Sequence, residues 1–278
     1  MRLRSRVPMR TVAHLSDLHF GRHDPAIVEA LLESLNRLRP DLVVISGDLT
    51  QRARSSQFFA AKRFLDQINS PKLVVPGNHD IPLYNLFARI VAPFSNYRRY
   101  ISVDEKSQCF ADDEIAVFGL NTVRRLNWKN GRLAEQQLLE MTTWFETLAP
   151  RIWKILVTHH PIASVKDARE ISTAQRSASA LTAVLKSGVH LVLSGHSHRA
   201  AHGALDAELE SRGSLLVIHA GTAISTRTRG GQRNSYNLLT VEAPRLSVTI
   251  MESSVGAGFS RGPQTQYILC GSIWQPVL

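Results

Sequence analysis

Cysteine is almost missing from this chain, because only two of its 278 residues, Cys109 and Cys270, carry a thiol. They lie far apart and in no metal-binding or redox spacing, which argues against the disulfide framework of small secreted domains. A single structural bridge between them is the minor alternative. The scarcity of cysteine is typical of a reducing compartment, so we expect a cytoplasmic protein.

Long apolar runs are lacking as well. No stretch approaches the roughly eighteen apolar residues that a membrane-spanning helix needs. The run from Val12 to Leu15 is too short for the core of a signal peptide. We also find no internal repeat and no linker rich in glycine, serine or proline. We therefore expect a single domain over residues 1–278, with its core at about 10–252 and an irregular tail at about 253–278.

Acidic residues are outnumbered, with 23 Asp and Glu against 33 Lys and Arg, and the formal net charge is +10. This charge attracts phosphate-bearing substrates, nucleic acids or acidic lipid surfaces, and a solubilising surface explains it equally well. No long block of Lys and Arg favours a nucleic-acid partner. Arg124, Arg125, Arg227 and Arg229 suit phosphate contacts, but solvated surface charge explains them too, so they stay outside the predicted site.

The first half of the chain alternates apolar runs with amphipathic helical patterns. The spacing predicts strands at Thr11–Ser16, Leu42–Ser46 and Lys72–Pro76, and helices at Pro25–Leu38 and Ser55–Ile68. Asp24 before Pro25 is a good helix start, because Asp caps free N–H groups and proline tolerates the first helical position. This alternating order predicts a parallel sheet with right-handed crossovers.

The second half contains more strands. Helices are predicted at Leu133–Leu148 and Thr173–Lys186, and a tight turn at Pro244-Arg245 joins the last two strands. The predicted strands are Ile115–Leu120, Ile152–Thr158, His190–Ser194, Leu215–Ala220, Tyr236–Glu242 and Leu246–Met251. Two packed sheets with helices outside account for this many strands. The glycines and prolines of Val255–Leu278 favour an irregular tail.

Five short polar blocks carry the chemistry, and each follows a predicted strand. They are Asp17-Leu18-His19, Gly47-Asp48, Gly77-Asn78-His79-Asp80, His159-His160 and Gly195-His196-Ser197-His198. Neighbouring strands of an α/β fold end at one edge, where distant blocks converge. Each block alone is ambiguous, because Asp and Asn also cap helices and form turns. Five such blocks, each placed directly after a predicted strand, together predict one site.

Two of the blocks place a pair of ligands two residues apart. In an extended segment such residues point to the same side, so Asp17 and His19 can reach one metal. The same holds for His196 and His198. Asp48 offers two carboxylate oxygens and can bridge two cations.

The remaining blocks offer different chemistry. Asn78 supplies a neutral carbonyl oxygen, His79 can protonate a leaving group, and Asp80 can orient an imidazole. Adjacent residues of an extended chain point to opposite faces, so we expect His159 to face the site and His160 to be structural. A donor set of oxygen and nitrogen without thiolates suits Mn, Fe, Zn, Ni or Co, and Mg less well.

These blocks resemble the calcineurin-like metallophosphoesterase superfamily, whose pattern is D-x-H, G-D, G-N-H-[DE], H and G-H-x-H. The match spans Asp17 to His198. The chain is similar to the small bacterial branch with class III cyclic-nucleotide phosphodiesterases and DNA-repair exonuclease-like relatives. The resemblance implies a four-layer α/β/β/α sandwich and two divalent ions. By motif, one ion is held by Asp17, His19 and His198, the other by Asn78, His159 and His196, and Asp48 bridges them.

One position departs from the pattern. The protein-phosphatase branch reads G-D-x-x-D-R-G, whereas this chain has Gln51 in place of the second acid. Glutamine cannot be the anionic partner of a catalytic histidine, which argues against phosphoprotein phosphatase activity. It leaves His79 to be tuned by another group, for which Asp80 is the candidate.

We therefore expect in-line attack on phosphorus by a metal-bridging water, with His79 assisting the leaving group. The expected substrate is a cyclic nucleotide or a similar small phosphodiester. A bulkier substrate, such as a UDP-linked lipid precursor, a glycerophosphodiester or a nucleic-acid end, is the alternative. Two further alternatives are a non-catalytic binding scaffold and a basic nucleic-acid-binding module, whose affinity would fall steeply with salt.

Overall fold

The computed structural model describes residues 9–127, 129–165, 173–206, 214–229, 231–254, 256 and 258–277. Its first half has the predicted order of β1 (Arg10–Leu15), α1 (Pro25–Leu38), β2 (Leu42–Ser46), α2 (Ser55–Asp66) and β3 (Lys72–Val75). Asp24 caps α1 as expected, because its side chain accepts a hydrogen bond from the Ala26 backbone N–H at 2.9 Å.

The predicted strands and helices of the second half are also present. They are β5 (Ile115–Leu120), α5 (Glu135–Glu146), β6 (Trp153–Thr158), α6 (Ser177–Lys186), β7 (Leu191–Ser194), β9 (Ser214–His219), β10 (Ser235–Glu242) and β11 (Arg245–Ser254). Glu242 pairs with Arg245 across the tight turn that joins β10 to β11. The expected hairpin is therefore confirmed.

Among the described residues up to 254, two short α-helices and two strands have no counterpart in the sequence prediction. They are α3 (Leu86–Val91), α4 (Ser95–Tyr100), β4 (Ser107–Ala111) and β8 (Ala201–Asp206). Both missed strands lie at the edges of a sheet. An edge strand packs against one neighbour only, and the mixed polar composition of β4 gives no clean alternation of apolar residues.

Two mixed sheets form the centre of the molecule. The first has the order β13-β12-β11-β10-β1-β2-β3, and the second has the order β4-β5-β6-β7-β9-β8. The predicted parallel pairing of β1, β2 and β3 is confirmed. In the second sheet β5, β6, β7 and β9 are parallel, with β4 and β8 antiparallel at its edges.

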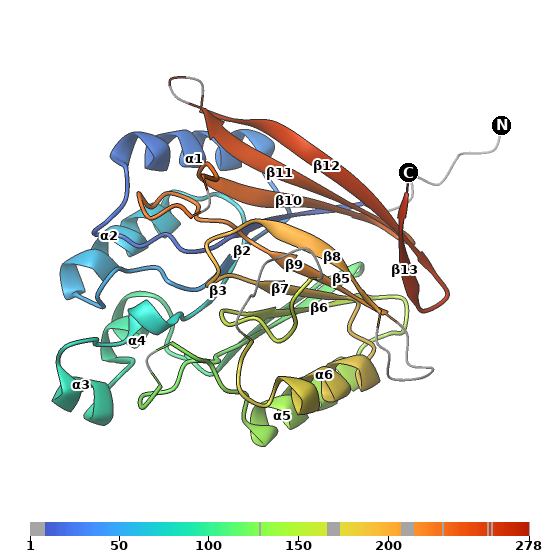
Figure 1. Cartoon of the computed structure of the whole chain (residues 1–278), viewed down its shortest axis with the longest axis horizontal. Coiled ribbons are helices and arrows are strands. Elements are labelled where there is room, and N and C mark those ends of the chain that lie inside the picture. The colour runs from blue at the N-terminus through green and yellow to red at the C-terminus, as the bar shows by residue number, and fades with distance from the viewer. Residues whose placement is uncertain are drawn as a thin grey trace.

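Successive side chains along each strand point to opposite faces of the sheet, and this alternation builds the layers. Val12 faces the core between the two sheets, whereas its neighbour Ala13 faces the core beneath α1 and α2. In the second sheet Val117 faces the inter-sheet core, and Phe118 packs with residues of α5 and α6. Figure 1 shows α1 at the top and α5 and α6 at the bottom, with the sheets between them. The expected four-layer α/β/β/α sandwich is confirmed.

The irregular tail expected at about 253–278 is wrong over the part that the structure describes. There β12 (Gly258–Cys270) and β13 (Ile273–Val277) extend the first sheet as antiparallel strands. Gly258 and Gly271 have φ of +74° and +63° and stand at the two ends of β12, so these glycines mark turns. Pro263 lies opposite a shift in register between Thr249 and Met251, and such a bulge tolerates its missing N–H.

None of the described helices is long and apolar enough to cross a membrane. Cys109 and Cys270 are both exposed free thiols.

The C-terminal strand pair completes the inter-sheet core, which makes its contribution measurable. Trp274 is 2% exposed, stacks edge-on against Trp153 at 5.3 Å and donates from Nε1 to the His190 carbonyl at 3.1 Å. We predict that Trp274→Ala lowers the free energy of unfolding by about 3–5 kcal/mol, since it leaves a cavity and an unpaired carbonyl. Denaturant unfolding measures the effect.

Ile273→Ala on the same strand is the control, because that side chain is 50% exposed. Its expected effect is within about 0.5 kcal/mol. Equal effects of the two substitutions would show that the strand is not anchored through the tryptophan.

Candidate metal centre

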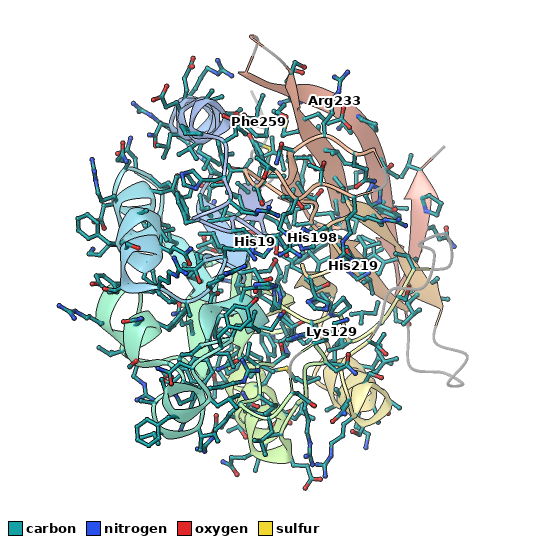
Figure 2. All side chains as sticks on the ribbon, turned by 60° about the vertical axis from the view of Figure 1, so that its left-hand side comes forward. His19, Lys129, His198, His219, Arg233 and Phe259 are labelled. Atoms are coloured by element: carbon teal, nitrogen blue, oxygen red, sulfur yellow. The ribbon has the colours of Figure 1, made fainter. Side chains whose placement is uncertain are left out.

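Strand ends from both sheets bring the predicted residues together. Asp17 and His19 follow β1, Asp48 follows β2, and the turn Asn78–Asp80 follows β3. His159 follows β6, and His196 and His198 follow β7 in the other sheet. All eight predicted residues are buried except His79 and His196, which are half-buried. Figure 2 shows His19 and His198 side by side near the centre of the molecule.

Asp17, His19 and His198 form one group, called here the Asp17 cluster. Their facing atoms are Asp17 Oδ1 and the two Nε2 nitrogens. His198 Nε2 lies 3.3 Å from Asp17 Oδ1 and 3.4 Å from His19 Nε2, and His19 Nε2 lies 3.6 Å from Asp17 Oδ1. The two rings are stacked with centroids 5.0 Å apart. Three potential lone-pair donors therefore face one point.

Asn78, His159 and His196 form the second group, the Asn78 cluster. Asn78 Oδ1 lies 3.1 Å from both His159 Nε2 and His196 Nδ1, and the two nitrogens are 3.3 Å apart. This triangle has the same size as the first, and it draws on three different strand ends.

Asp48 lies between the two clusters. Its Oδ2 is 3.6 Å from His19 Nε2, and its Oδ1 is 3.4 Å from His159 Nε2. The Oδ1 atom also accepts a hydrogen bond of 2.8 Å from the backbone N–H of His79. One carboxylate thus presents one oxygen to each cluster.

The backbone at these positions differs from the sequence expectation. Asp17, His19, Asp48, His196 and His198 all have positive φ, between 48° and 68°. We expected the paired ligands to lie on an extended chain, and this expectation is wrong. Their common direction comes from left-handed backbone. This conformation costs about 1–2 kcal/mol at each non-glycine residue. It persists where the surrounding structure over-determines it, which is typical of functional sites.

Hydrogen bonds behind two of the imidazoles fix their orientation. His159 Nδ1 donates to the Ser46 carbonyl at 2.7 Å, so Nε2 is free to present a lone pair to the site. His198 Nδ1 lies 2.8 Å from Thr222 Oγ1. Neither partner could be found from the sequence, because a backbone carbonyl has no residue signature and Thr222 stands outside the five blocks.

Asp80 does not orient an imidazole, and that expectation is wrong. Its carboxylate accepts hydrogen bonds from the backbone N–H groups of Leu49, Thr50 and Gly77, at 3.1, 2.8 and 2.9 Å. It therefore ties the loop after β2 to the loop after β3. Burial and the charge of Asp48 raise the pKa of Asp80 to about 6.

The ring of His79 is held by the main chain instead. Its Nδ1 donates to the backbone carbonyl of Gln51 at 2.8 Å. Gln51 therefore supports His79 through its backbone oxygen, although its side chain cannot supply an anion. The ring packs edge-on against His19, with centroids 4.9 Å apart.

His160 lies closer to the site than the sequence suggests. Residues 159 and 160 form a bend, not an extended strand, so the rule that adjacent side chains point to opposite faces does not apply. One ring nitrogen of each falls, with one of His196, within a group spanning 4.8 Å. The Nδ1 atom of His160 is 2.7 Å from Thr122 Oγ1.

The electrostatics of the site favour anionic carboxylates. Burial acts to raise the pKa of Asp17, but His198, His19 and His159 outweigh it and hold the pKa well below its usual range. The pKa of Asp48 is lowered in the same way, against burial, by His159, His79 and His19. Burial lowers the pKa of His196 to about 4. Burial acts to lower the pKa of His19, but Asp17 and Asp48 outweigh it and raise that pKa. Carboxylate oxygens and the His196 lone pair are therefore available at neutral pH.

The donor set fits divalent metal ions. Atoms that share one ion at about 2.0–2.2 Å lie roughly 3.0–3.5 Å from one another, and the two clusters have spacings of 3.1–3.6 Å. The Oδ1 atom of Asp17 is buried and has no hydrogen-bond partner. A buried carboxylate oxygen that faces two imidazole nitrogens needs a cation to offset its desolvation.

The four arginines named from the sequence separate into two pairs. Arg124 donates to Gln137 Oε1 at 2.8 Å and Arg125 to the Ile90 carbonyl at 2.9 Å, and both contacts are structural. Arg227 and Arg229 lie close enough for their charges to act on the clusters. The Arg227 charge opposes the raised pKa of His19, and the Arg229 charge adds to the lowered pKa of His198, which is caused mainly by burial.

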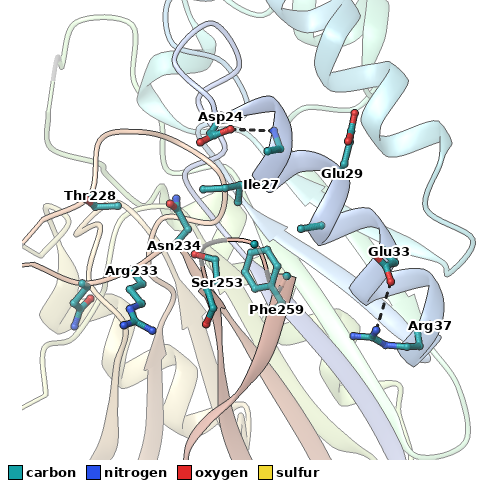
Figure 3. A pocket seen from close by; sticks show the side chains of 16 residues that line it. Asp24, Ile27, Glu29, Glu33, Arg37, Thr228, Arg233, Asn234, Ser253 and Phe259 are labelled. Carbon is teal, nitrogen blue, oxygen red and sulfur yellow. Dashed lines mark hydrogen bonds and ion pairs between the residues drawn. The ribbon is translucent and has the colours of Figure 1, made fainter.

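A cavity of about 920 Å³ lies elsewhere, between α1 and the ends of β11 and β12. Figure 3 shows Ile27 and Phe259 in its wall, together with the ion pair between Glu33 and Arg37. None of the eight predicted residues lines this cavity. This cavity is therefore separate from the convergent residues at the strand ends.

Residues 10–200 match the sequence pattern of the family described as calcineurin-like phosphoesterases. This stretch is more than half of the chain and contains all five blocks. The chain belongs to this family. The resemblance inferred from the blocks is thereby confirmed, and the protein is a metal-dependent phosphoester hydrolase by family.

Relatives of this phosphoesterase differ in how much of their length the chain matches. A probable cyclic nucleotide phosphodiesterase of Vesicomyosocius okutanii subsp. Calyptogena okutanii is 25% identical over 217 residues, which are 76% of this chain and 83% of that protein. The glycerophosphodiester phosphodiesterase GpdQ of Enterobacter lignolyticus is 36% identical over 80 residues, but these are only 25% of this chain and 29% of GpdQ.

Solved structures agree on the fold of this phosphoesterase. A dimetal phosphatase from Danio rerio superposes with a TM-score of 0.63 over 92% of this chain and 98% of its own, at 14% identity. Purple acid phosphatase PPD1 from yellow lupin gives a TM-score of 0.66 over 94% of this chain and 54% of its own, at 11% identity. At such low identity the likeness shows the fold alone.

The role of Asp80 in this phosphoesterase can be tested by a nearly isosteric change. In the native protein both carboxylate oxygens of Asp80 accept hydrogen bonds from backbone N–H groups. Asp80→Asn replaces one of these oxygens with an NH₂ group, which cannot accept them. We predict a loss of about 1–3 kcal/mol in the free energy of unfolding and weaker metal binding, because the two loops carrying Asp48 and Asn78 lose their tie. Denaturant unfolding and metal analysis measure the two effects.

Asp66→Asn is the matched control, since Asp66 forms an exposed ion pair with Lys62. It should change stability by less than about 1 kcal/mol and leave metal content intact. A harmless Asp80→Asn would show that the two loops hold their positions without it.

Proposed function

We propose that this phosphoesterase hydrolyses phosphodiester bonds with the help of two divalent metal ions. The Asp17 cluster would hold one ion and the Asn78 cluster the other, and Asp48 would contribute one oxygen to each. The observation that carries the proposal is the placement of Asp48, whose Oδ2 and Oδ1 lie 3.6 and 3.4 Å from nitrogens of the two clusters. When bound, such ions lower the pKa of water and neutralise charge that builds on the phosphoryl oxygens.

The donor chemistry restricts the ions without choosing one. Each cluster combines imidazole nitrogen with carboxylate or amide oxygen and offers no thiolate, which favours Mn, Fe or Zn. Co and Ni suit the same donors, and Mg suits them less well. The supporting contacts of Ser46 and Thr222 fix the ring directions and so raise affinity for any of these metals.

His79 is the proposed proton donor to the leaving oxygen. Its Nδ1 carries a proton, because the Gln51 carbonyl at 2.8 Å can only accept a hydrogen bond. A second proton on Nε2 makes the imidazolium that gives it up as the bond to phosphorus breaks. The backbone N–H of His79 on Asp48 Oδ1 holds this residue next to the shared carboxylate.

Relatives support a diester over a monoester. Two proteins matched by this chain are named for hydrolysis of cyclic nucleotides and of glycerophosphodiesters. We propose a small phosphodiester as the substrate, with a bulkier diester as the alternative. Parallel assays with bis-p-nitrophenyl phosphate, cyclic AMP, a UDP-linked lipid and single-stranded DNA separate these substrate classes.

The shared role of Asp48 predicts that both ions depend on it. In Asp48→Ala we expect metal content to fall from about two ions per chain to below one, and hydrolysis of bis-p-nitrophenyl phosphate to cease. Metal analysis of the purified variant and a colorimetric assay measure this. Asp113→Ala, at an exposed acid, should keep both ions, and thermal unfolding confirms that each variant is folded. Unchanged metal content in Asp48→Ala would contradict the shared role.

His79 is expected to act in turnover without holding metal. His79→Ala should retain its ions and lower kcat by about 10²–10⁴-fold, the usual contribution of a general acid. His202→Ala serves as a control, because its ring contacts the Tyr267 hydroxyl at 2.7 Å, away from both clusters. Normal turnover by His79→Ala would remove this residue from the mechanism.

A further inference from the structure

A second, strongly basic cavity opens beside the metal centre. Its volume is about 420 Å³. Three arginines line it from the loops after β1 and β2, a fourth from the segment between β9 and β10, and no acidic residue takes part. The lining is Gly21, Arg22, Gln51, Arg52, Arg54, Gln57 and Arg227, called here the arginine pocket.

Gln51 connects the arginine pocket to the reaction site. Its backbone carbonyl accepts the hydrogen bond from His79 Nδ1, and its Oε1 accepts one of 3.4 Å from Arg227 Nη1. The first lining residue, Gly21, stands two positions after His19. A molecule whose scissile phosphorus lies at the clusters therefore has this cavity within reach.

The loops that form the pocket are tied together by the main chain. The Arg22 carbonyl accepts hydrogen bonds of 2.9 Å from the Thr226 N–H and from the Ser225 hydroxyl. Gln57 Oε1 accepts one of 2.9 Å from the Arg52 N–H. The cavity is therefore a built feature that these contacts hold open.

The charges of the pocket have no internal partner. Within the described ranges no ion pair joins Arg22, Arg52, Arg54 or Arg227 to a carboxylate, although Arg10, Arg98 and Arg176 each have one. Arg52 rests over the ring of Tyr84 at 5.0 Å, which places its guanidinium without neutralising it. The N-terminus of α2, capped by Arg54 without a side-chain hydrogen bond, adds its positive dipole end.

Four unneutralised guanidinium groups in one concavity repel one another, and a multiply charged anion relieves that repulsion. Arginine presents paired N–H donors that match phosphate oxygens. We propose that the arginine pocket binds a second phosphate group of the substrate, separate from the scissile phosphodiester. The inference rests on the proposed function and narrows its substrate class to phosphodiesters that carry a further phosphate. A cyclic mononucleotide, with its single phosphate, would leave the pocket empty.

Two chromogenic substrates with the same scissile bond test this directly. Thymidine 5′-(p-nitrophenyl phosphate) has one phosphate, and its 3′-phosphorylated form has a second. For the wild-type enzyme we expect kcat/KM to be about tenfold or more higher for the 3′-phosphorylated form, with the gain falling at higher salt. In Arg22→Ala/Arg54→Ala the ratio of the two values should fall toward one.

A matched control removes the same amount of charge elsewhere. Arg63→Ala/Arg176→Ala lowers the net charge equally at residues outside the pocket, and it should keep the wild-type ratio. A ratio near one in the wild type would overturn the proposal. So would a high ratio that survives in Arg22→Ala/Arg54→Ala, because the second phosphate would then be bound elsewhere.

Calorimetric binding separates this inference from the proposed function. Thymidine 3′,5′-bisphosphate should bind the wild type more tightly than thymidine 5′-monophosphate, and the Arg22→Ala/Arg54→Ala variant should lose that preference. If neither chromogenic substrate is hydrolysed by the metal-replete enzyme, the proposed function fails. The calorimetric preference for the bisphosphate then tests phosphate binding by the pocket on its own. The absence of this preference overturns the inference.

Discussion

The burial of Asp48 between two sets of imidazoles is the constraint on which the rest of the structure depends. A carboxylate with 1% exposure is stable only where cations or hydrogen-bond donors replace its lost water. Asp48 receives one backbone N–H, from His79, and otherwise faces ring nitrogens of His19 and His159. Its position requires that loops from both sheets meet at one point and stay there.

The sandwich meets this requirement because its packed layers, which lie away from the site, hold the strand ends in place. Strands β1, β2 and β3 end together in one sheet and β6 and β7 in the other, and three apolar cores hold these layers. The left-handed backbone of Asp17, His19 and Asp48 is unfavourable on its own, and close packing around the strand ends compensates for it. The fold therefore places stable layers behind a strained and polar edge.

Much of this architecture could be read from the sequence, and the reasons for the failures are physical. Periodicity identified the long buried strands and the amphipathic helices, because burial on one or two faces leaves a pattern. It missed the edge strand β4, which packs on one side only, and it misread β12, where glycines and a proline mark turns and a bulge. The five blocks predicted residues that the structure brings together, since their side chains are unusual in that order after strands.

What the sequence did not reveal was how those residues are held. Asp80 was expected beside an imidazole but binds backbone N–H groups, and His159 and His198 rely on the Ser46 carbonyl and Thr222. The support of His79 by the main-chain oxygen of position 51 has an evolutionary consequence. Every amino acid brings that oxygen, so substitution at this position leaves the ring's anchor in place. The side chain there can therefore vary, and with it the lining of the neighbouring basic cavity, while the orientation of the His79 ring is kept.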